Sequence, residues 1–164
     1  MNKNCAIYPG SFDPVHLGHI DIITRSAKIF SSVIIAVAAS KSKSPMFSVE
    51  SRIAMLRESL EGHPGIEIIA LDGLLVDFAR QHNVFTIIRG LRAVSDFEFE
   101  FQMALMNRKL EPRLETVFLT SKEDYTYISS RIIKEVGTMG GDVSHFVAAP
   151  VLESLLKAVP KISK

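Results

Sequence analysis

The chain of 164 residues has no tryptophan and a single cysteine, Cys5. One cysteine cannot close an intramolecular disulfide, which excludes a cystine-stabilised scaffold and favours a reducing, cytoplasmic location. No apolar run reaches the roughly 18 residues that a membrane span needs, and no secretory signal pattern opens the chain. We therefore expect no contact with a membrane, and we expect Cys5 to lie buried in the first strand.

An excess of charge of either sign is also lacking. The 19 lysines and arginines nearly balance the 18 aspartates and glutamates, which leaves a formal net charge of +1. This balance gives no long-range attraction to nucleic acid, so any phosphate site must come from a local cluster. With 47% hydrophobic and 23% charged residues, the composition is that of a globular protein, and the length fits one domain over residues 1–164.

The two common nucleotide-binding signatures are absent. The sequence contains no G-x-x-x-x-G-K-[ST] and no G-x-G-x-x-G that follows a strand. The glycines between residues 137 and 141 follow no expected strand and are interpreted as a turn. A nucleotide site in this chain therefore has to be built from other segments.

The chain does contain a regular alternation of strand and helix patterns. Apolar, β-branched runs predict strands over residues 5–8, 33–38, 66–71, 84–88 and 116–119. Helical patterns predict helices over residues 20–30, 48–60, 74–82, 95–110, 129–136 and 150–158, with Ser48 as an N-cap and Gly137 as a terminator. The alternation predicts an α/β fold, namely a Rossmann-like, doubly wound sheet of about five parallel strands with helices on both faces.

The expected helix over residues 95–110 is apolar on two sides. Its large apolar residues form two stripes, with Phe97, Phe101 and Leu105 on one side and Phe99, Met103 and Met106 on the other. A surface helix of a monomer needs only one such stripe. The second stripe indicates either burial against another subunit or a fully internal helix, and the pattern alone does not separate the two.

The segment from Tyr8 to His19 connects the first strand to the first helix and carries the strongest functional signal. In parallel sheets, ligands collect where strands end and helices begin, because the unpaired N–H groups of a helix N-terminus suit phosphate. Gly10 and Gly18 would let a phosphate approach the backbone, and His19 would donate a hydrogen bond to a phosphoryl oxygen. His16 and His19 are three apart, so on a helix they would share one face.

Two other interpretations of this segment stay open. A turn rich in proline and glycine, with Asp13 as a helix cap, explains Asp13 and Pro14 but not Gly18 or His19. A His-x-x-His pair also suits zinc, although no cysteine pair or further histidine lies at ligand spacing.

Lys41 and Lys43 follow the second expected strand. A lysine in this position would neutralise negative charge that develops on a transferring phosphoryl group. The alternative is an ordinary solvated loop of lysine and serine.

Two arginines, Arg89 and Arg92, bracket Gly90 at the end of the fourth expected strand. Arginine contacts phosphate in a bidentate manner, which indicates a phosphate site at this sheet edge. The alternative is a surface ion pair between Arg92 and Asp96. From the pattern alone, Glu100 is expected to be a solvated helix residue.

The serines Ser129 and Ser130 open the fifth expected helix. Helix capping fully explains one of them. The same helix N-terminus would also hold a phosphate group, with the hydroxyls as further donors.

These motifs resemble those of a known enzyme family. The segment from Tyr8 to His19 resembles the HxGH motif of the nucleotidyltransferase superfamily. With R-G-L-R-A-V-S-D-F-E-F-E from Arg89 to Glu100 and I-S-S ending at Ser130, nearly the whole chain resembles the bacterial phosphopantetheine adenylyltransferase family. That family usually has threonine or asparagine where His16 stands here, whereas the wider superfamily has histidine.

The resemblance implies that an adenylyl group passes from ATP to 4'-phosphopantetheine, giving 3'-dephospho-coenzyme A and pyrophosphate in coenzyme A biosynthesis. It implies in-line attack without a covalent intermediate, and Mg²⁺ that is carried by ATP rather than by a metal site of the protein. It also implies a cytoplasmic homohexamer. The alternatives are a sister adenylyltransferase that acts on nicotinate or nicotinamide mononucleotide, and a non-catalytic nucleotide sensor.

The resemblance also implies roles for individual residues. The catalytic residues would be His19, Lys43 and Arg92. The ATP-binding residues would be Ser11, Phe12, His19, Gly90, Leu91, Arg92, Glu100, Tyr125, Thr126, Tyr127, Ile128, Ser129, Ser130 and Arg131. The residues that bind 4'-phosphopantetheine would be Ser11, Lys43, Leu75 and Arg89.

Overall fold

The computed structural model describes residues 4–39, 45–92 and 94–158. Its strands are β1 (Cys5–Gly10), β2 (Ser32–Ala38), β3 (Ile66–Leu71), β4 (Thr86–Leu91) and β5 (Glu115–Thr120). Its helices are α1 (Leu17–Ile29), α2 (Val49–Ser59), α3 (Leu75–His82), α4 (Val94–Leu110), the short 3-10 helix η1 (Glu123–Tyr125), α5 (Ser130–Thr138) and α6 (Ala149–Ala158). Of the helices within these ranges, none has the length and apolar character to cross a bilayer.

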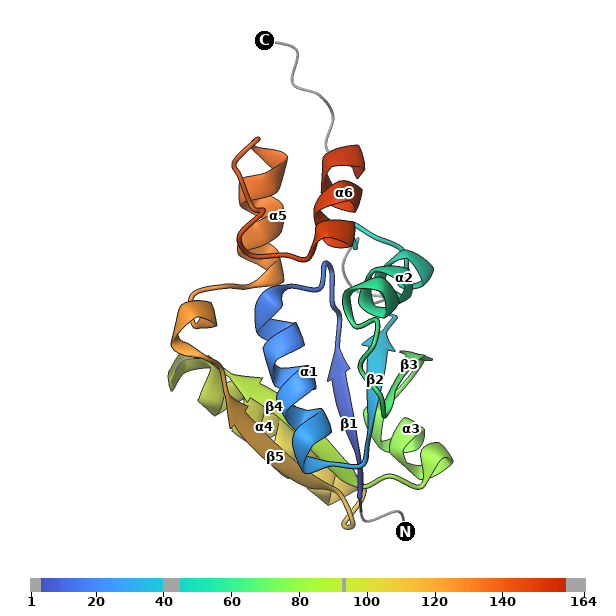
Figure 1. Ribbon diagram of the computed structural model, residues 1–164. Helices are drawn as coiled ribbons and strands as arrows, with labels where there is room; N and C mark the ends of the chain where they lie inside the picture. The colour runs from blue at the N-terminus through green and yellow to red at the C-terminus, as the bar shows by residue number, and fades with distance from the viewer. Residues whose placement is uncertain (1–3, 40–44, 93, 159–164) are drawn as a thin grey trace.

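The five strands form one parallel sheet in the order β3-β2-β1-β4-β5. β1 lies in the centre, with β2 and β3 on one side of it and β4 and β5 on the other (Figure 1). This is the doubly wound arrangement that the sequence predicts, and the prediction is confirmed. In such sheets the strand ends beside the reversal of chain order leave a crevice in which ligands bind.

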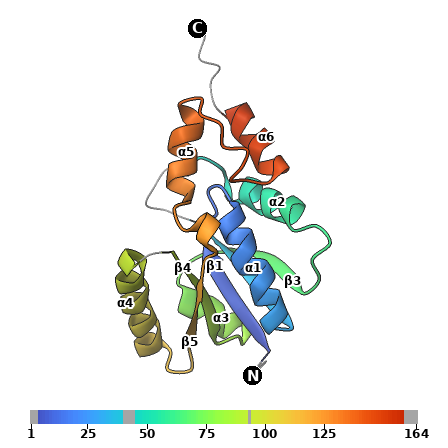
Figure 2. The same ribbon diagram turned by 60° about the vertical axis from the view of Figure 1, so that its left-hand side comes forward.

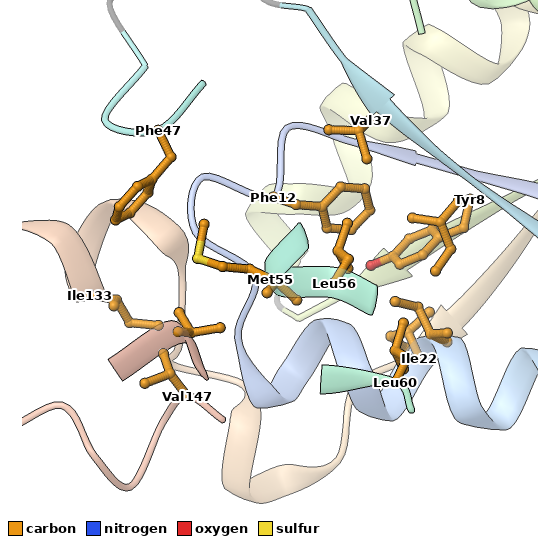
Figure 3. Packing of buried hydrophobic residues seen from close by; sticks show 14 of the residues in the cluster. Tyr8, Phe12, Ile22, Val37, Phe47, Met55, Leu56, Leu60, Ile133 and Val147 are labelled. Atoms are coloured by element: carbon orange, nitrogen blue, oxygen red, sulfur yellow. The ribbon is translucent and has the colours of Figure 1, made fainter. Parts of the chain in front are cut away.

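Side chains alternate along the strands, so each strand contributes to two cores. On β1, Ala6 and Tyr8 belong to the core that α1 and α2 cover, whereas Cys5 and Ile7 belong to the core that α3 covers. Figure 3 shows part of the first core, which draws side chains from the strands, from α1 and α2 and from α5. Cys5 is buried, as the sequence predicts.

The helices α5 and α6 stand beyond the end of the sheet toward which β1 runs (Figure 1 and Figure 2). Ile133 of α5 and Val151 and Leu155 of α6 anchor them in the first core. Ser129 caps α5, because its side chain accepts a hydrogen bond from the backbone N–H of Ile132. The first turn of α5 lies beside the segment that leads into α1, since the hydroxyl of Ser130 donates to the carbonyl of Pro14 at 2.8 Å.

Most element boundaries differ by one to three residues from the sequence prediction, and α1 begins at Leu17 rather than at residue 20. The fourth strand runs to residue 91 rather than 88, because its ladder with β5 continues to the end of β5, so Arg89 and Gly90 lie within the strand. Gly137 does not end α5. The helix continues to Thr138, and Gly140, with a φ of 82°, makes the turn that follows.

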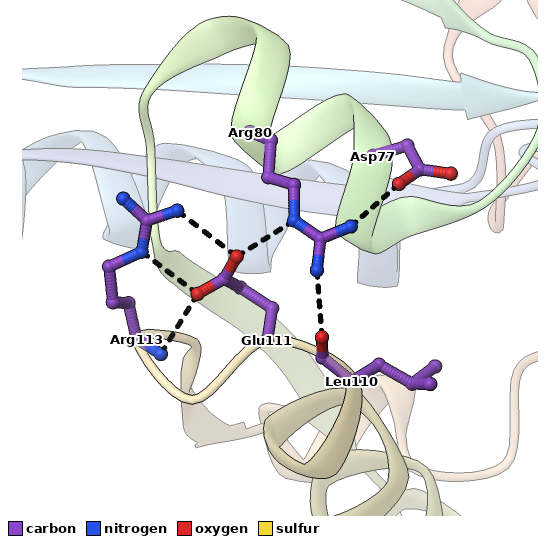
Figure 4. Close-up of polar contacts among 5 residues, drawn as sticks. All are labelled: Asp77, Arg80, Leu110, Glu111 and Arg113. Atoms are coloured by element: carbon purple, nitrogen blue, oxygen red, sulfur yellow. Dashed lines mark hydrogen bonds and ion pairs between the residues drawn. The ribbon is translucent and has the colours of Figure 1, made fainter.

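A charged cluster fastens the chain after α4 to α3 (Figure 4). The carboxylate of Glu111 accepts hydrogen bonds from Arg113 and Arg80, and Arg80 also donates to Asp77 and to the carbonyl of Leu110. The hydrogen bonds from Arg113, and then from Arg80, lower the pKa of Glu111 to about 2. Glu111 therefore stays ionised and holds both arginines.

The helix α4 packs on β4 and β5, but much of its apolar surface is exposed. The exposed side chains are Phe97, Phe99, Phe101, Met103, Leu105, Met106 and Leu110. Both predicted stripes are thus at the surface of the single chain, and the fully internal helix is wrong. Burial of this surface against another subunit stays a prediction.

Candidate active site

A cleft of about 430 Å³ opens at the carboxyl ends of β1 and β4, beside the first turns of α1 and α5. It occupies the crevice that the reversal of strand order creates. The predicted site residues that line it are His19, Arg89, Gly90, Arg92, Glu100, Tyr125, Ser129 and Ser130. The structure therefore brings together three of the segments that the sequence singles out.

His16 and His19 cap the start of α1 reciprocally. The backbone N–H of His16 donates to Nδ1 of His19 at 3.2 Å, and the backbone N–H of His19 donates to Nδ1 of His16 at 3.3 Å. The rings stack with their centroids 3.6 Å apart. His16 is therefore the N-cap of α1, and the alternative in which Asp13 caps the helix is wrong. Gly18 leaves room for this cap, since a Cβ there would lie 3.1 Å from the His16 ring.

Three titratable groups of the cleft wall are held in their neutral forms. Burial, and then the positive charge of Arg92, lower the pKa of His16 to about 3. Burial, followed by His16, Arg92 and Arg89, holds the pKa of His19 well below its ordinary value. Burial raises the pKa of Tyr8 to about 12, although Arg89 opposes the shift. Two imidazoles and a phenol thus line the cleft as uncharged hydrogen-bonding groups.

Arg89 forms a two-pronged ion pair with Glu100. Its Nε donates to one carboxylate oxygen at 2.6 Å, its Nη2 donates to the other, and its Nη1 donates to the carbonyl of Pro9 at 2.7 Å. Glu100 is therefore not the solvated residue that the bare pattern predicts, because α4 packs on β4 and turns this side chain toward the strand end. A guanidinium has five N–H donors, so two of those of Arg89 remain for a ligand.

Arg92 is held between two elements. Its Nε pairs with the carboxylate of Asp96 at 2.9 Å, which is the ion pair considered from the sequence. Its Nη1 donates to the carbonyl of Ile128, just before α5, at 2.9 Å. Arg92 thus contributes to the cleft while it fixes the start of α4 against the start of α5.

Asp13 belongs to the turn between β1 and α1 and ties three segments together. Its carboxylate accepts hydrogen bonds from the backbone N–H groups of Met46 and Phe47 at 3.0 and 2.9 Å and pairs with Lys134 of α5 at 2.6 Å. Burial alone would raise the pKa of Asp13, but the hydrogen bonds from Lys134 and the two amides outweigh it and lower the pKa. One ionised carboxylate thus joins the turn, the segment before α2, and α5.

Several predicted site residues do not line this cleft. They are Ser11, Phe12, Leu75, Leu91, Thr126, Tyr127, Ile128 and Arg131. Two of them are buried and contact lining residues. The ring of Phe12 contacts that of His19 with the centroids 5.0 Å apart, and Ile128 supplies the carbonyl to which Arg92 donates.

Some of the other predicted residues make contacts elsewhere. Leu75 packs against the second core. The sequence pattern alone, without the family resemblance, also indicates a core position for it. Tyr127 is exposed, and the hydroxyl of Thr126 donates to the carbonyl of Glu123. Lys41 and Lys43 fall outside the described residues, so their roles stay predictions.

The sequence interpretation missed Tyr8, Ile22, Phe99 and Ser121, which also line the cleft. Strand alternation offers a signal for Tyr8, since it shares a strand face with Ala6 and stands near the carboxyl end of β1. Phe99 offers none, because its apolar character assigns it to a packing stripe.

The donor set gives little support to zinc. Both histidines of the His-x-x-His pair accept backbone N–H groups at Nδ1, and the cleft carboxylates of Asp96 and Glu100 are paired with arginines. Within the part of the chain that the structure describes, no three His, Cys, Asp or Glu side chains are grouped as metal ligands.

Comparison with known proteins points to one family. The cytidylyltransferase-like family model matches residues 7–136, a range that contains every segment of the cleft wall. The phosphopantetheine adenylyltransferase of Methylococcus capsulatus is 53% identical to this chain, over 93% of this chain and 94% of its own length. Those of Aromatoleum aromaticum and Legionella pneumophila are 50% and 52% identical, over 97% and 94% of this chain and 98% and 91% of their own lengths.

A solved structure shows the same fold. The crystal structure of a protein from Vibrio parahaemolyticus, provisionally assigned as a nicotinate-nucleotide adenylyltransferase, matches with a TM-score of 0.68 at 20% sequence identity. The match covers 93% of this chain and 91% of that one. At this identity the likeness shows the Rossmann-like nucleotidyltransferase fold alone.

Proposed function

Since this chain belongs to the cytidylyltransferase-like nucleotidyltransferases and, within them, to the phosphopantetheine adenylyltransferase family, we propose that it transfers the adenylyl group of ATP to 4'-phosphopantetheine. The products are 3'-dephospho-coenzyme A and pyrophosphate, so the enzyme acts in coenzyme A biosynthesis. The observation that carries the proposal is the cleft, in which the β1–α1 turn, the end of β4 with α4, and the start of α5 converge. These are the segments in which the sequence resembles that family.

The reaction exchanges one P–O bond for another. A phosphate oxygen of 4'-phosphopantetheine attacks the α-phosphorus of ATP, and the bond from that phosphorus to the oxygen bridging to the β-phosphate breaks. Pyrophosphate leaves with the electron pair of that bond. Such transfers depend on positioning and on stabilising charge on the phosphoryl oxygens, so no side chain has to act as a nucleophile.

His19 and Arg92 support this chemistry in different ways. A neutral, partly buried imidazole offers an N–H to an oxygen of the α-phosphate, and this hydrogen bond strengthens as charge builds up in the transition state. The guanidinium of Arg92, oriented by Asp96 and by the carbonyl of Ile128, offers its charge to the departing phosphates. Lys43 would neutralise further charge and stays a prediction.

The ion pair of Arg89 with Glu100 links the part of the cleft expected to bind 4'-phosphopantetheine to the part expected to bind ATP. The resemblance assigns Arg89 to 4'-phosphopantetheine and Glu100 to ATP, and the two side chains are in direct contact. Because Glu100 fixes the plane of the guanidinium, the two remaining N–H groups of Arg89 have a fixed direction. We infer that this pair sets the distance between the acceptor and the nucleotide.

We infer that Mg²⁺ enters with ATP. The carboxylates of the cleft are engaged by arginines, so the ion would be held by phosphate oxygens and water, as is common for Mg²⁺. It would neutralise part of the triphosphate charge. No residue of the described chain is assigned as its ligand.

We also infer that the chain forms a homo-oligomer through α4, which in the resembling family is a hexamer. The exposed apolar side chains of α4 run along the helix in the two stripes described above, and exposed apolar surface of this kind marks a contact site. A cytoplasmic location, expected from the sequence, stays a prediction.

One assay tests the proposed function. Purified protein is mixed with MgATP and 4'-phosphopantetheine, and dephospho-coenzyme A and pyrophosphate are measured by chromatography and an enzyme-coupled assay. We expect both products in equal amounts. Pyrophosphate release with nicotinate or nicotinamide mononucleotide instead would identify the sister enzyme, and ATP binding without pyrophosphate release from any acceptor would identify a sensor.

A further inference from the structure

Arg52 of α2 is a buried cation without a carboxylate partner. Its residue is 1% exposed, and across residues 4–39, 45–92 and 94–158 no ion pair joins it to an acid. Buried arginines are usually paired with a carboxylate. Here the guanidinium donates to three backbone carbonyls, those of Ser48 at 3.3 Å, Ser11 at 2.6 Å and Ala38 at 3.0 Å. None of the roles proposed above uses this residue.

Two of these carbonyls stand at the ends of neighbouring strands. Ala38 is the last residue of β2, and Ser11 directly follows β1, whose last residue, Gly10, pairs with Val37. A single nitrogen, Nη1 of Arg52, donates to both carbonyls. Arg52 therefore fixes the first residue of the β1–α1 turn to the end of β2.

The next residue of the turn is in an unfavourable backbone conformation. Phe12 has a φ of 47°, in the left-handed region that a bulky side chain rarely adopts, and such residues persist where their surroundings determine them from several sides. Arg52 holds the carbonyl before Phe12, and three hydrogen bonds hold the carboxylate of Asp13 after it. The Phe12 ring is fully buried and lies so close to Gly10 that a Cβ there would be 2.9 Å from the ring.

The ring held in this way contacts the central histidine of the cleft. Phe12 meets His19 edge to face, at an interplanar angle of 70° and a centroid distance of 5.0 Å. His16 stacks on His19 as well. The imidazole of His19 is thus fixed by two rings, one set by the cap of α1 and the other by the turn that Arg52 holds.

We propose that Arg52 is a positioning residue for His19. By binding the carbonyl of Ser11 it keeps Phe12 in its left-handed conformation, and the Phe12 ring keeps the imidazole of His19 in place in the cleft. Arg52 itself does not line the cleft, so it acts through the turn and not on the substrate. The inference rests on the proposed function, because the part of His19 in adenylyl transfer belongs to that proposal.

A double-mutant cycle of Arg52→Lys and His19→Ala tests this path, with kcat and both KM values measured by dephospho-coenzyme A formation. Lysine keeps the charge but lacks the planar fork that reaches three carbonyls. We expect Arg52→Lys to lower kcat about 10- to 100-fold, as for a misplaced catalytic group, with both KM values within about threefold of wild type. In the His19→Ala background the same substitution should cause no further loss, because its effect passes through the imidazole. The control is Arg57→Lys, an exposed arginine on the same helix, which should match wild type.

An Arg52→Lys variant with wild-type kcat overturns the inference, and so does one that loses the same factor with and without His19. If circular dichroism shows that Arg52→Lys does not fold, Phe12→Leu takes its place in the cycle, since it removes the ring edge and keeps the hydrogen bonds of Arg52. A loss that adds to that of His19→Ala then overturns the inference. A wild-type protein that releases no pyrophosphate refutes the proposed function instead, so the two failures are distinguishable.

Discussion

His16 and His19 each accept a backbone N–H at Nδ1, so in the neutral rings the proton of each imidazole resides on Nε2. The backbone of residue 16, not its side chain, sets the tautomer of His19. The lone pair of Nδ1 is occupied, and the ring faces the cleft as a donor. A neutral donor of fixed tautomer suits the stabilisation of phosphoryl oxygens and is a poor nucleophile.

The tautomers can be observed directly. Long-range ¹H–¹⁵N spectra of protein labelled with ¹⁵N-histidine at pH 7 should show Nε2 protonated and Nδ1 unprotonated for both residues, with His16→Asn and His19→Asn used for assignment. A protonated Nδ1 on His19, or shifts averaged between the two tautomers, would contradict the reciprocal cap.

The same pair should make the fold sensitive to acid. The pKa of His16 is lowered to about 3 and that of His19 is lowered as well, so between about pH 6.5 and 5 the unfolded chain binds protons that the folded chain does not. The free energy of unfolding should therefore fall with falling pH, by up to about 1.4 kcal/mol per pH unit for each histidine. Stability that depends on these groups is present above pH 6.5 and is lost below it.

His16→Asn separates the two contributions, because asparagine still accepts the N–H of residue 19 but does not titrate. Urea unfolding from pH 7.5 to 5 should show roughly half of the wild-type slope in this variant. Equal slopes in the two proteins would mean that His16 is not buried in its neutral form.

Local chemistry was predictable from the sequence where partners are close along the chain. The alternation of strand and helix patterns predicts the parallel sheet. The i to i+4 spacing suggests the ion pair of Arg92 with Asp96, which the structure contains. Two other pairs that hold the site together are not of this kind. Arg89 and Glu100 are 11 residues apart and Asp13 and Lys134 are 121 apart, so they meet only through the packing of α4 and α5.

The backbone geometry of the site could not be predicted from the sequence either. The sequence places two histidines three apart, but the reciprocal cap depends on His16 standing just outside the helix with an extended backbone. In the same way, the amino-acid sequence does not indicate that Phe12 has a positive φ, or that Arg52 donates to carbonyls at the ends of two strands.

The ion pair of Asp13 with Lys134 should contribute strongly to stability. Asp13→Asn leaves the ammonium of Lys134 without its carboxylate and places an amide against two backbone N–H groups, so we expect a loss of about 1–3 kcal/mol in urea unfolding, as when buried hydrogen-bonding groups lose their partner. Lys157→Met is the matched control, since that lysine is exposed and its ion pair with Glu153 is long, at 4.0 Å. A loss in Asp13→Asn no larger than in the control would show that the pair does not hold α5.

The apolar surface of α4 should govern assembly. Leu105, which is half exposed, belongs to this surface. Leu105→Glu should shift the mass measured by sedimentation from an oligomer to a monomer, because a carboxylate in an apolar interface is desolvated without a partner. Lys109→Glu, an exposed change on the same helix, should leave the mass unchanged. A wild-type chain that sediments as a monomer at micromolar concentration would refute the proposed contact.

The central claim is that His19 stabilises the transition state of adenylyl transfer in a cleft that works without an attacking side chain. The most direct measurement is kcat for dephospho-coenzyme A formation by His19→Ala, together with ATP affinity by calorimetry and with His145→Ala, an exposed histidine, as the control. The account predicts that kcat of His19→Ala falls by about 100-fold or more while ATP affinity stays within about threefold, as for other single transition-state donors. Turnover of His19→Ala near that of wild type would contradict it.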